Sequence, residues 1–283
     1  MIKNVFSAIG SSAKRLVGCW RGLGILILLY AALLFSTYMF FTTGQATAGQ
    51  VVLSFALPIV AIVLFFALQV AIARFGIEDR APRLLGGAFK DFWKLVVISI
   101  PVALLVWAVI YSAGRIDSSF KPTVQQAARA LTPRPKAPGH AVPSAPVPWQ
   151  VTLTWTVAYV LLLAAFPLML AQVWAKVARL GFGEALRSLG RTLARAFAPR
   201  AVLTYAFGFI FFAVVPYLLV FVKTPAANAW IEAGLLAARL IIAALLTLLG
   251  WTMTVGALSE LADGAPSRAG EFREGAEHAA VST

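Results

Sequence analysis

The strongest constraint on this chain is a series of long apolar runs that suit membrane-spanning helices. Six such runs cover residues of about 23–41, 51–73, 95–113, 151–173, 201–222 and 230–258. A helix rises about 1.5 Å per residue, so about 20 apolar residues cross a hydrocarbon core about 30 Å thick. We therefore predict an all-α membrane protein, with a six-helix transmembrane domain over residues 23–258.

Composition and charge placement agree with this prediction. The 283 residues are 60% apolar and 12% charged, whereas soluble domains are about 45–50% apolar and about 25% charged. The net charge of +13 lies mainly in segments that flank the apolar runs, where basic residues face anionic lipid headgroups. We expect membrane lipids as partners and no binding of nucleic acid. Whether the chain also forms a homo-oligomer or binds a protein partner is left open by the sequence.

Three segments outside the spans have their own patterns. Residues 1–22 place apolar side chains at helical spacing among lysines and arginines, which predicts an amphipathic helix in the membrane interface. Residues 114–150 hold seven prolines and predict an extended external loop. Residues 259–283 are polar and predict a disordered tail.

The distribution of basic residues predicts the orientation. With six spans and the amino terminus inside, the inner segments hold 17 lysines and arginines and the outer segments hold 6. The positive-inside rule therefore predicts both termini in the cytoplasm, with five basic residues in the proline-rich loop as the dissenting segment.

The connector between spans four and five carries the clearest amphipathic pattern in the chain. Apolar residues recur at helical spacing from Phe182 to Phe197, and Arg187, Arg191 and Arg195 recur every four residues beside them. This pattern predicts an interfacial helix whose arginines contact anionic lipid phosphates. The alternative is that these positive charges only hold the orientation of the protein.

Spans two and three with their connector resemble spans four and five with theirs. The segment GGAFKDFWKLVVISIPV at 86–102 can be compared with TLARAFAPRAVLTYAFG at 192–208. Both pairs start and end outside, so the two units would be related by an axis along the membrane normal, as in some transporters. Shared membrane composition is the other explanation of the likeness.

The segment FGEALRSLGRTLARAFAPRAV at 182–202 and its weaker counterpart at 76–98 carry a family resemblance. The chain resembles bacterial six-span proteins related to the membrane domain of glycerophosphodiester phosphodiesterases and to YciC-like families. The resemblance implies a six-span protein of a bacterial cytoplasmic membrane, and a eukaryotic organelle stays open. It implies no reaction, because most such proteins have no assigned activity and this chain lacks the soluble phosphodiesterase domain that some carry.

Spans one to five contain no ionisable Asp, Glu, Lys or Arg, but Glu232 and Arg239 lie at or in the sixth span on one helix face. If the span begins near Trp230, Arg239 lies about 15 Å deep and must pair with Glu232 or face a cavity. If it begins nearer Gly234, both side chains lie at the outer interface. We favour the interfacial position.

A proline lies in the middle portion of each of spans two to five, at Pro58, Pro101, Pro167 and Pro216. Each proline removes a backbone hydrogen bond and predicts a kink. Broken helices line substrate pathways in transporters, although proline is also common in membrane helices for packing reasons.

No catalytic motif is visible, and His140 and His278 are too far apart in the sequence to suggest a metal site. We expect no cofactor and no enzymatic activity. The sequence favours a non-enzymatic multi-pass inner-membrane protein in envelope or lipid homeostasis, or a membrane partner of another protein. The alternative is a small transporter or channel with a pathway between the two repeat units.

Overall fold

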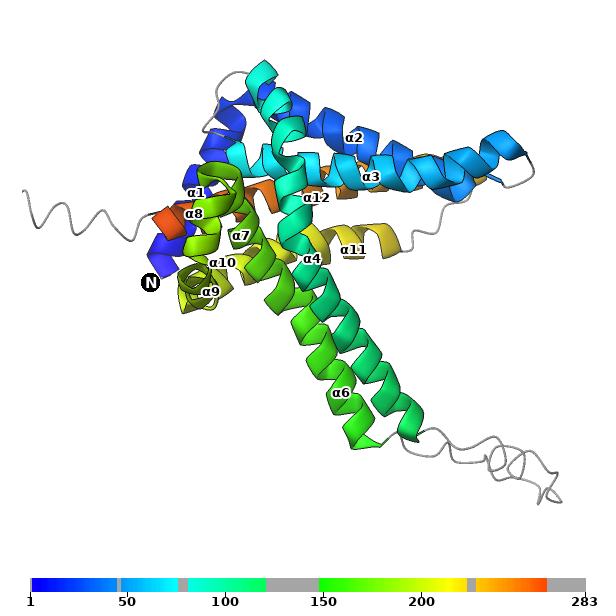
Figure 1. The fold of residues 1–283 in the computed structure, drawn as a ribbon. Helices are drawn as coiled ribbons and strands as arrows, with labels where there is room; N and C mark the ends of the chain where they lie inside the picture. Colours follow the sequence, from blue (N-terminus) through cyan, green and yellow to red (C-terminus); the bar gives the residue numbers. More distant parts are fainter. Residues whose placement is uncertain (1, 45–46, 76–80, 121–147, 223–227, 264–283) are drawn as a thin grey trace, which may run out of the picture. The chain divides into compact units, whose positions relative to one another are not determined.

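The computed structural model describes residues 2–44, 47–75, 81–120, 148–222 and 228–263, and the regular elements in this part are helical (Figure 1). Six of these helices are long and apolar enough to cross a membrane: Trp20–Thr42, Ala48–Arg74, Pro82–Phe120, Trp149–Leu180, Pro199–Phe221 and Ala229–Leu261. The predicted all-α membrane fold is confirmed.

The first half of the described chain forms α1 (Ile2–Gly18), α2 (Trp20–Thr42), α3 (Ala48–Arg74) and α4 (Ala81–Phe120). The fourth span is built of α6 (Trp149–Val160), the π-helix η1 (Leu161–Ala165) and α7 (Phe166–Leu180). Two short helices follow, α8 (Phe182–Arg187) and α9 (Leu189–Ala196). The fifth span is α10 (Pro199–Phe209), η2 (Ile210–Val214) and α11 (Val215–Phe221), and the sixth is α12 (Ala229–Asp263).

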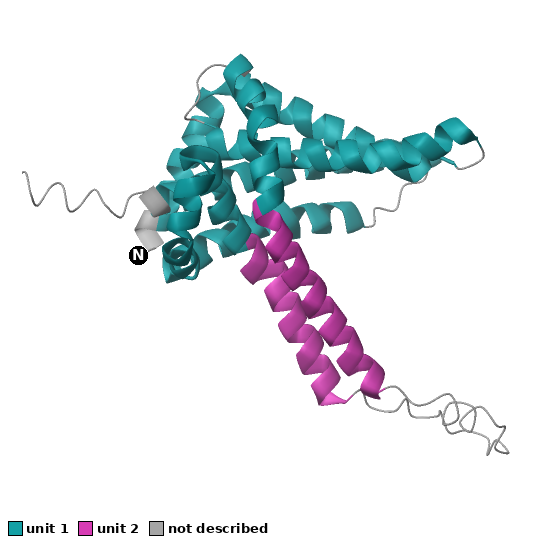
Figure 2. Ribbon diagram, in the orientation of Figure 1, with its two compact units in different colours: residues 1–97, 168–283 teal, residues 98–167 magenta. Residues whose placement is uncertain are grey.

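The chain divides into two compact units (Figure 2). The first comprises residues 1–97 and 168–283 and the second comprises residues 98–167. The first unit therefore holds α1 to α3, the start of α4, and nearly all of α7 through to α12. The second unit holds the remainder of α4 with α6 and η1. The contacts that follow all lie within the first unit.

Two helices extend into the segments that the sequence assigns to the external loop and the tail. Helix α4 continues past Ala113 to Phe120, and α12 continues past Leu258 to Asp263. The predicted starts of the external loop at 114 and of the disordered tail at 259 are therefore wrong. Helical hydrogen bonding does not stop where apolar composition stops, and the first proline after α4 is Pro122. The rest of both segments, 121–147 and 264–283, lies outside the described residues.

Helices α2 and α3 pack along each other as a hairpin (Figure 1). Thr47 caps α3, because its side chain accepts the Gln50 N–H while the Gln50 side chain accepts the Thr47 N–H. Between the two helices, Ser36 Oγ donates to the Leu57 carbonyl over 3.3 Å. A polar group inside the hydrocarbon region thus has a partner on the neighbouring helix.

Of the segment 1–22 that was predicted as an amphipathic helix, residues Ile2–Gly18 form α1 and residues from Trp20 onward begin α2. The buried face of α1 packs on protein. Val5, Ala8 and Leu16 are buried, and α1 contacts α12 and α10. Arg15 pairs with Glu260, and Ser11 donates to the same carboxylate. The expectation that α1 simply lies in the interface is therefore incomplete, because α1 is attached to the end of α12.

Helices α10–η2 and α12 cross at two glycines. A Cβ atom on Gly208 would overlap the Thr254 side chain, and one on Gly250 would lie 3.0 Å from the backbone nitrogen of Phe212. Small residues at a crossing let the backbones of membrane helices approach closely. These two glycines therefore set the distance between the fifth and sixth spans.

We expect Gly208→Ala to destabilise the protein by about 1–3 kcal/mol, because the added methyl group must displace Thr254 in a packed contact. The measurement is thermal or denaturant unfolding of the detergent-solubilised chain. Gly234→Ala on α12 is the matched control, because nothing lies within 4 Å of a Cβ placed there. Equal stability of the Gly208→Ala variant and the unaltered protein would contradict this account.

Candidate functional site

Two arginines exchange hydrogen bonds between the ends of α3 and α7. The Nε atom of Arg74 donates to the carbonyl of Ala178 over 2.9 Å, and the Nε atom of Arg179 donates to the carbonyl of Ala73 over 3.0 Å. Each arginine thus binds the residue that precedes the other. We call this arrangement the arginine exchange, and it has the reciprocity that a two-fold relation between α3 and α7 would produce.

The two helix ends share a short sequence pattern. Ile72-Ala73-Arg74-Phe75-Gly76 matches Val177-Ala178-Arg179-Leu180-Gly181 in residue type and order. The last carbonyls of a helix lack intrahelical donors, and a cation is favourable beside them. Gly181 has a φ of 89°, a backbone conformation suited to glycine, and it follows the last residue of α7.

The arginine exchange was not predicted from the sequence. Arg74 and Arg179 were interpreted only as connector charges that set the orientation, and the predicted repeat rested on residues 86–102 and 192–208. The available signal was the shared Ala-Arg pair followed two residues later by glycine.

The arginine exchange is joined to two further helices. Arg74 pairs with Asp91 of α4, and Lys94 pairs with the same carboxylate over 2.5 Å. Arg179 donates through Nη2 to Ser259 Oγ of α12 over 2.7 Å. The side chains of Arg74 and Asp91 are only 18% and 11% exposed. Because buried charges require partners, these contacts tie the ends of α3, α7 and α12 to the start of α4.

Aromatic rings fill the contact between α3 and α7 next to the arginine exchange. The Trp174 ring meets the rings of Phe65 and Phe66 at 6.0 and 5.8 Å between centroids, in edge-on geometry. Farther along α3, Gln69 Oε1 accepts a hydrogen bond from Trp251 Nε1 of α12 over 2.8 Å. The contact between α3 and α7 is therefore apolar, and the polar side chain of Gln69 on α3 is satisfied by Trp251.

The three predicted lipid-contacting arginines lie on two helices instead of one, because the helix is interrupted at Ser188 between α8 and α9. Arg187 ends α8, whereas Arg191 and Arg195 lie on α9, and all three are exposed. On the same two helices, Ala185, Thr192 and Ala196 are buried. Lys176 Nζ donates to Thr192 Oγ1 over 3.0 Å, which links α9 to α7.

The predicted apolar stripe on this connector is only partly buried. Leu186 and Phe197 are 52% and 54% exposed. Apolar and cationic side chains therefore share the outer surface of α8 and α9. We call Arg187, Arg191, Arg195, Leu186 and Phe197 the basic surface.

Glu232 and Arg239 lie near the start of the sixth span. Helix α12 begins at Ala229, where Asn228 Oδ1 accepts the Trp230 N–H over 3.0 Å, so Glu232 is in the first turn. Arg239 donates to the carbonyl of Val222, the residue that follows α11. The helix begins before Gly234, but the Arg239 side chain meets the end of the fifth span. An ion pair between Glu232 and Arg239 stays a prediction.

The four prolines divide into two kinds. Pro58 and Pro101 lie inside the continuous helices α3 and α4. Pro167 and Pro216 each follow a π-helix, with η1 ending at Ala165 and η2 ending at Val214. A proline ring collides with the carbonyl four residues earlier, and π turns re-route helical hydrogen bonds around such a position. The kinks predicted for these four positions stay predictions, and the π turns were not anticipated.

Comparison of the chain with family models, with curated proteins and with solved structures found no match. The family resemblance therefore stays an expectation.

We expect Arg74→Gln and Arg179→Gln each to destabilise the protein by about 2 kcal/mol, because each removes charge-assisted hydrogen bonds to buried acceptors. The double variant should lose less than the sum, because either change already breaks the exchange. Unfolding of the solubilised chain measures both effects. Arg83→Gln, at an exposed position on α4, is the control. Strict additivity would argue against a coupled pair.

Cys19 is the single cysteine of the chain, so a Cys19→Ser background removes the native thiol. In this background, we expect Arg239→Cys to react with a membrane-impermeant thiol reagent from the outer side only. The reason is that Arg239 reaches the carbonyl at the end of the fifth span. Asn228→Cys, exposed just before α12, gives the reference rate in sealed membranes. Labelling of position 239 from both sides would instead reveal a water-filled path and overturn the interfacial position.

Proposed function

We propose that this multi-pass membrane protein is a non-enzymatic, lipid-contacting protein of a bacterial cytoplasmic membrane. Its role would be in envelope or lipid homeostasis, alone or as the membrane partner of another protein. The observation that carries the proposal is the basic surface on α8 and α9, where three exposed arginines lie between the exposed apolar side chains Leu186 and Phe197 in the sequence.

The chemistry of the basic surface suits a membrane interface. The guanidinium groups of Arg187, Arg191 and Arg195 are exposed and make no ion pair with another described residue. Each basic group near an anionic surface contributes about 1 kcal/mol of attraction. Leu186 and Phe197 can enter the headgroup region beside them, as in interfacial amphipathic helices. Membrane lipids with anionic headgroups are the partners that this surface fits.

The position of α8 and α9 in the chain supports a cytoplasmic placement of the basic surface. They follow the end of α7, where the arginine exchange lies, and lead to the start of α10. The contact between α1 and the end of α12 supports both termini on that same side. The excess of 17 over 6 basic residues in the inner segments supports the cytoplasm as that side.

A transporter with a pathway between the repeat units is the second candidate. The reciprocity of the arginine exchange favours two related units, as many transporters have. A pathway between α3 and α7 would have to separate Trp174 from Phe65 and Phe66 and break the exchange. The packing of this contact therefore ranks transport below the lipid-contacting role.

The test is the lipid preference of a variant that lacks the three arginines, Arg187→Gln/Arg191→Gln/Arg195→Gln. At about 1 kcal/mol for each charge, we expect its preference for phosphatidylglycerol over phosphatidylcholine to fall by roughly tenfold or more. Native mass spectrometry of the protein released from mixed-lipid nanodiscs measures the bound lipids.

The matched control is Lys14→Gln/Arg83→Gln/Lys90→Gln, which removes the same charge from exposed positions on α1 and α4. We expect this variant to keep most of the preference. If both triple variants lose it equally, the preference comes from total charge, and the basic surface is not a lipid site.

A further inference from the structure

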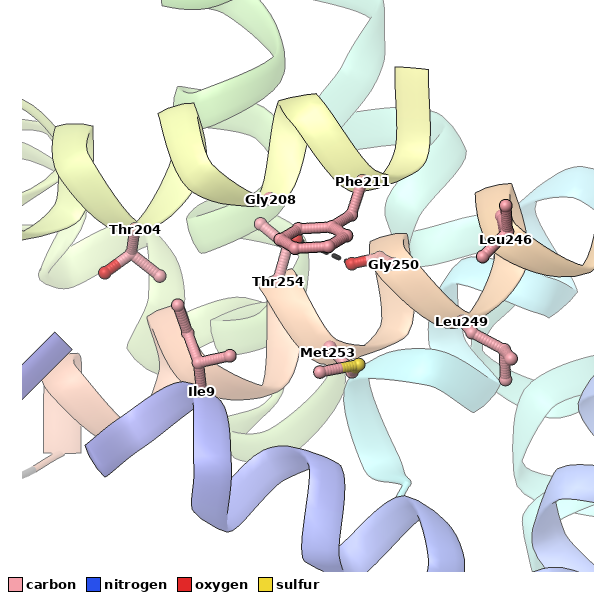
Figure 3. Close-up of a pocket in the computed structure, with 9 residues that line it drawn as sticks. All are labelled: Ile9, Thr204, Gly208, Phe211, Leu246, Leu249, Gly250, Met253 and Thr254. Carbon is pink, nitrogen blue, oxygen red and sulfur yellow. Dashed lines mark hydrogen bonds between the residues drawn. The ribbon is translucent and has the colours of Figure 1, made fainter. Parts of the chain in front are cut away.

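An apolar cavity of about 280 Å³ lies between α1, α10–η2 and α12 (Figure 3). Ile9 lines it from α1, Thr204 and Phe211 line it from the fifth span, and Leu249 and Met253 line it from α12. The cavity is separate from the basic surface and from the arginine exchange. Neither the fold nor the proposed function explains it.

The polar atoms of the cavity wall are already satisfied. Thr204 Oγ1 donates to the carbonyl of Arg200 over 2.9 Å. Thr254 Oγ1 donates to the carbonyl of Gly250 over 2.6 Å, as Figure 3 shows. The rest of the wall is hydrocarbon and the thioether of Met253. A smaller apolar cavity, of about 150 Å³, stays dry in water and takes up benzene. The cavity therefore favours an apolar occupant over water.

The walls of the cavity are held apart from one another. The fifth and sixth spans already meet where Gly208 faces Thr254 and Gly250 faces Phe212, so they cannot approach further. Helix α1 is fixed to α12 by the pair of Arg15 with Glu260. A cavity whose surroundings cannot relax retains its full energetic cost when empty. Filling it with an apolar group would stabilise the protein.

The surface beside the cavity is apolar. Phe211, which lines it, is 57% exposed on a membrane-spanning helix. On the α1 side, the ring of Phe6 meets the ring of Phe207 at 5.4 Å, and Phe6 is 55% exposed. In a bilayer, such exposed rings face acyl chains. An occupant therefore enters from the hydrocarbon and not from water.

A cation lies at the headgroup end of the same span. Arg200 is exposed at the start of α10, one helical turn before Thr204. We infer that the cavity binds one acyl chain of a phospholipid whose phosphate lies near Arg200. The site requires none of the arginines of the basic surface, so it can be tested independently of the proposed function.

The test is photolabelling of the full chain in proteoliposomes with a phospholipid that carries a diazirine on one acyl chain. Peptide mass spectrometry locates the adducts. We expect adducts on the cavity-lining parts of α1 and α12, around Ile9 and Met253, to saturate as the probe fraction rises. Adducts around Phe55, which is 73% exposed on α3, should rise in proportion to the probe. A proportional rise at Met253 as well would overturn the proposal.

A filled cavity provides the matched comparison. Leu249→Trp should lower the saturable labelling at least fivefold, whereas Leu240→Trp, at a 49% exposed position of the same helix, should leave it unchanged. Unchanged labelling in a folded Leu249→Trp variant would overturn the site. If that variant does not fold, Met253→Phe replaces it. Saturation of the labelling in the unaltered protein still decides whether the cavity is a binding site.

A diacylglycerol probe with the same diazirine chain tests the phosphate contact. We expect it to label the cavity several-fold more weakly than the phospholipid probe, and Arg200→Gln should reduce phospholipid labelling to the diacylglycerol level. Equal labelling by both probes in the unaltered protein would overturn the assignment of the headgroup to Arg200. The triple variant of the basic surface should label the cavity normally.

Discussion

The need to satisfy backbone carbonyls in lipid underlies most of this structure. A bilayer offers no water to a helix end, so each terminal carbonyl needs a donor from the protein or a position at the interface. Arg74 and Arg179 meet that need for each other's helices, and Arg239 meets it for the carbonyl that follows α11. Because each donor comes from another helix, satisfying a helix end also fixes a tertiary contact.

The spans could be predicted from sequence because lipid sets a criterion that each segment meets alone, namely length and apolar content. The arginine exchange could not be predicted in this way. The positive-inside rule already explains an arginine that follows an apolar run. The structural role becomes visible only from the hydrogen-bond partners, which are Ala178 for Arg74 and Ala73 for Arg179. Glu260 was assigned to the disordered tail for a similar reason, since nothing local indicates its pairing with Arg15. The π turns before Pro167 and Pro216 depend on backbone hydrogen bonds that hydropathy does not report.

The glycine crossing and the cavity lie next to each other, between the fifth and sixth spans. Gly208 and Gly250 remove side chains where the fifth and sixth spans touch, which brings the backbones together. Both glycines also line the cavity, together with Ile9 of α1. In a soluble protein such a hollow would meet water or be refilled by a larger residue. In a membrane the surrounding medium consists of lipid acyl chains, and one of these chains can fill an open cavity without any change in sequence.

Burial separates two uses of arginine that look alike in the sequence. Arg74 and Arg179 lie at helix ends beside carbonyl acceptors, where partial burial strengthens the hydrogen bond. Arg187, Arg191 and Arg195 instead are exposed on helices α8 and α9, whose packing buries Ala185, Thr192 and Ala196. A positive-inside count treats both groups identically, because both lie next to spans. Only the second group leaves its charge available to a lipid phosphate, which is why the basic surface, rather than the total charge of the chain, carries the functional argument.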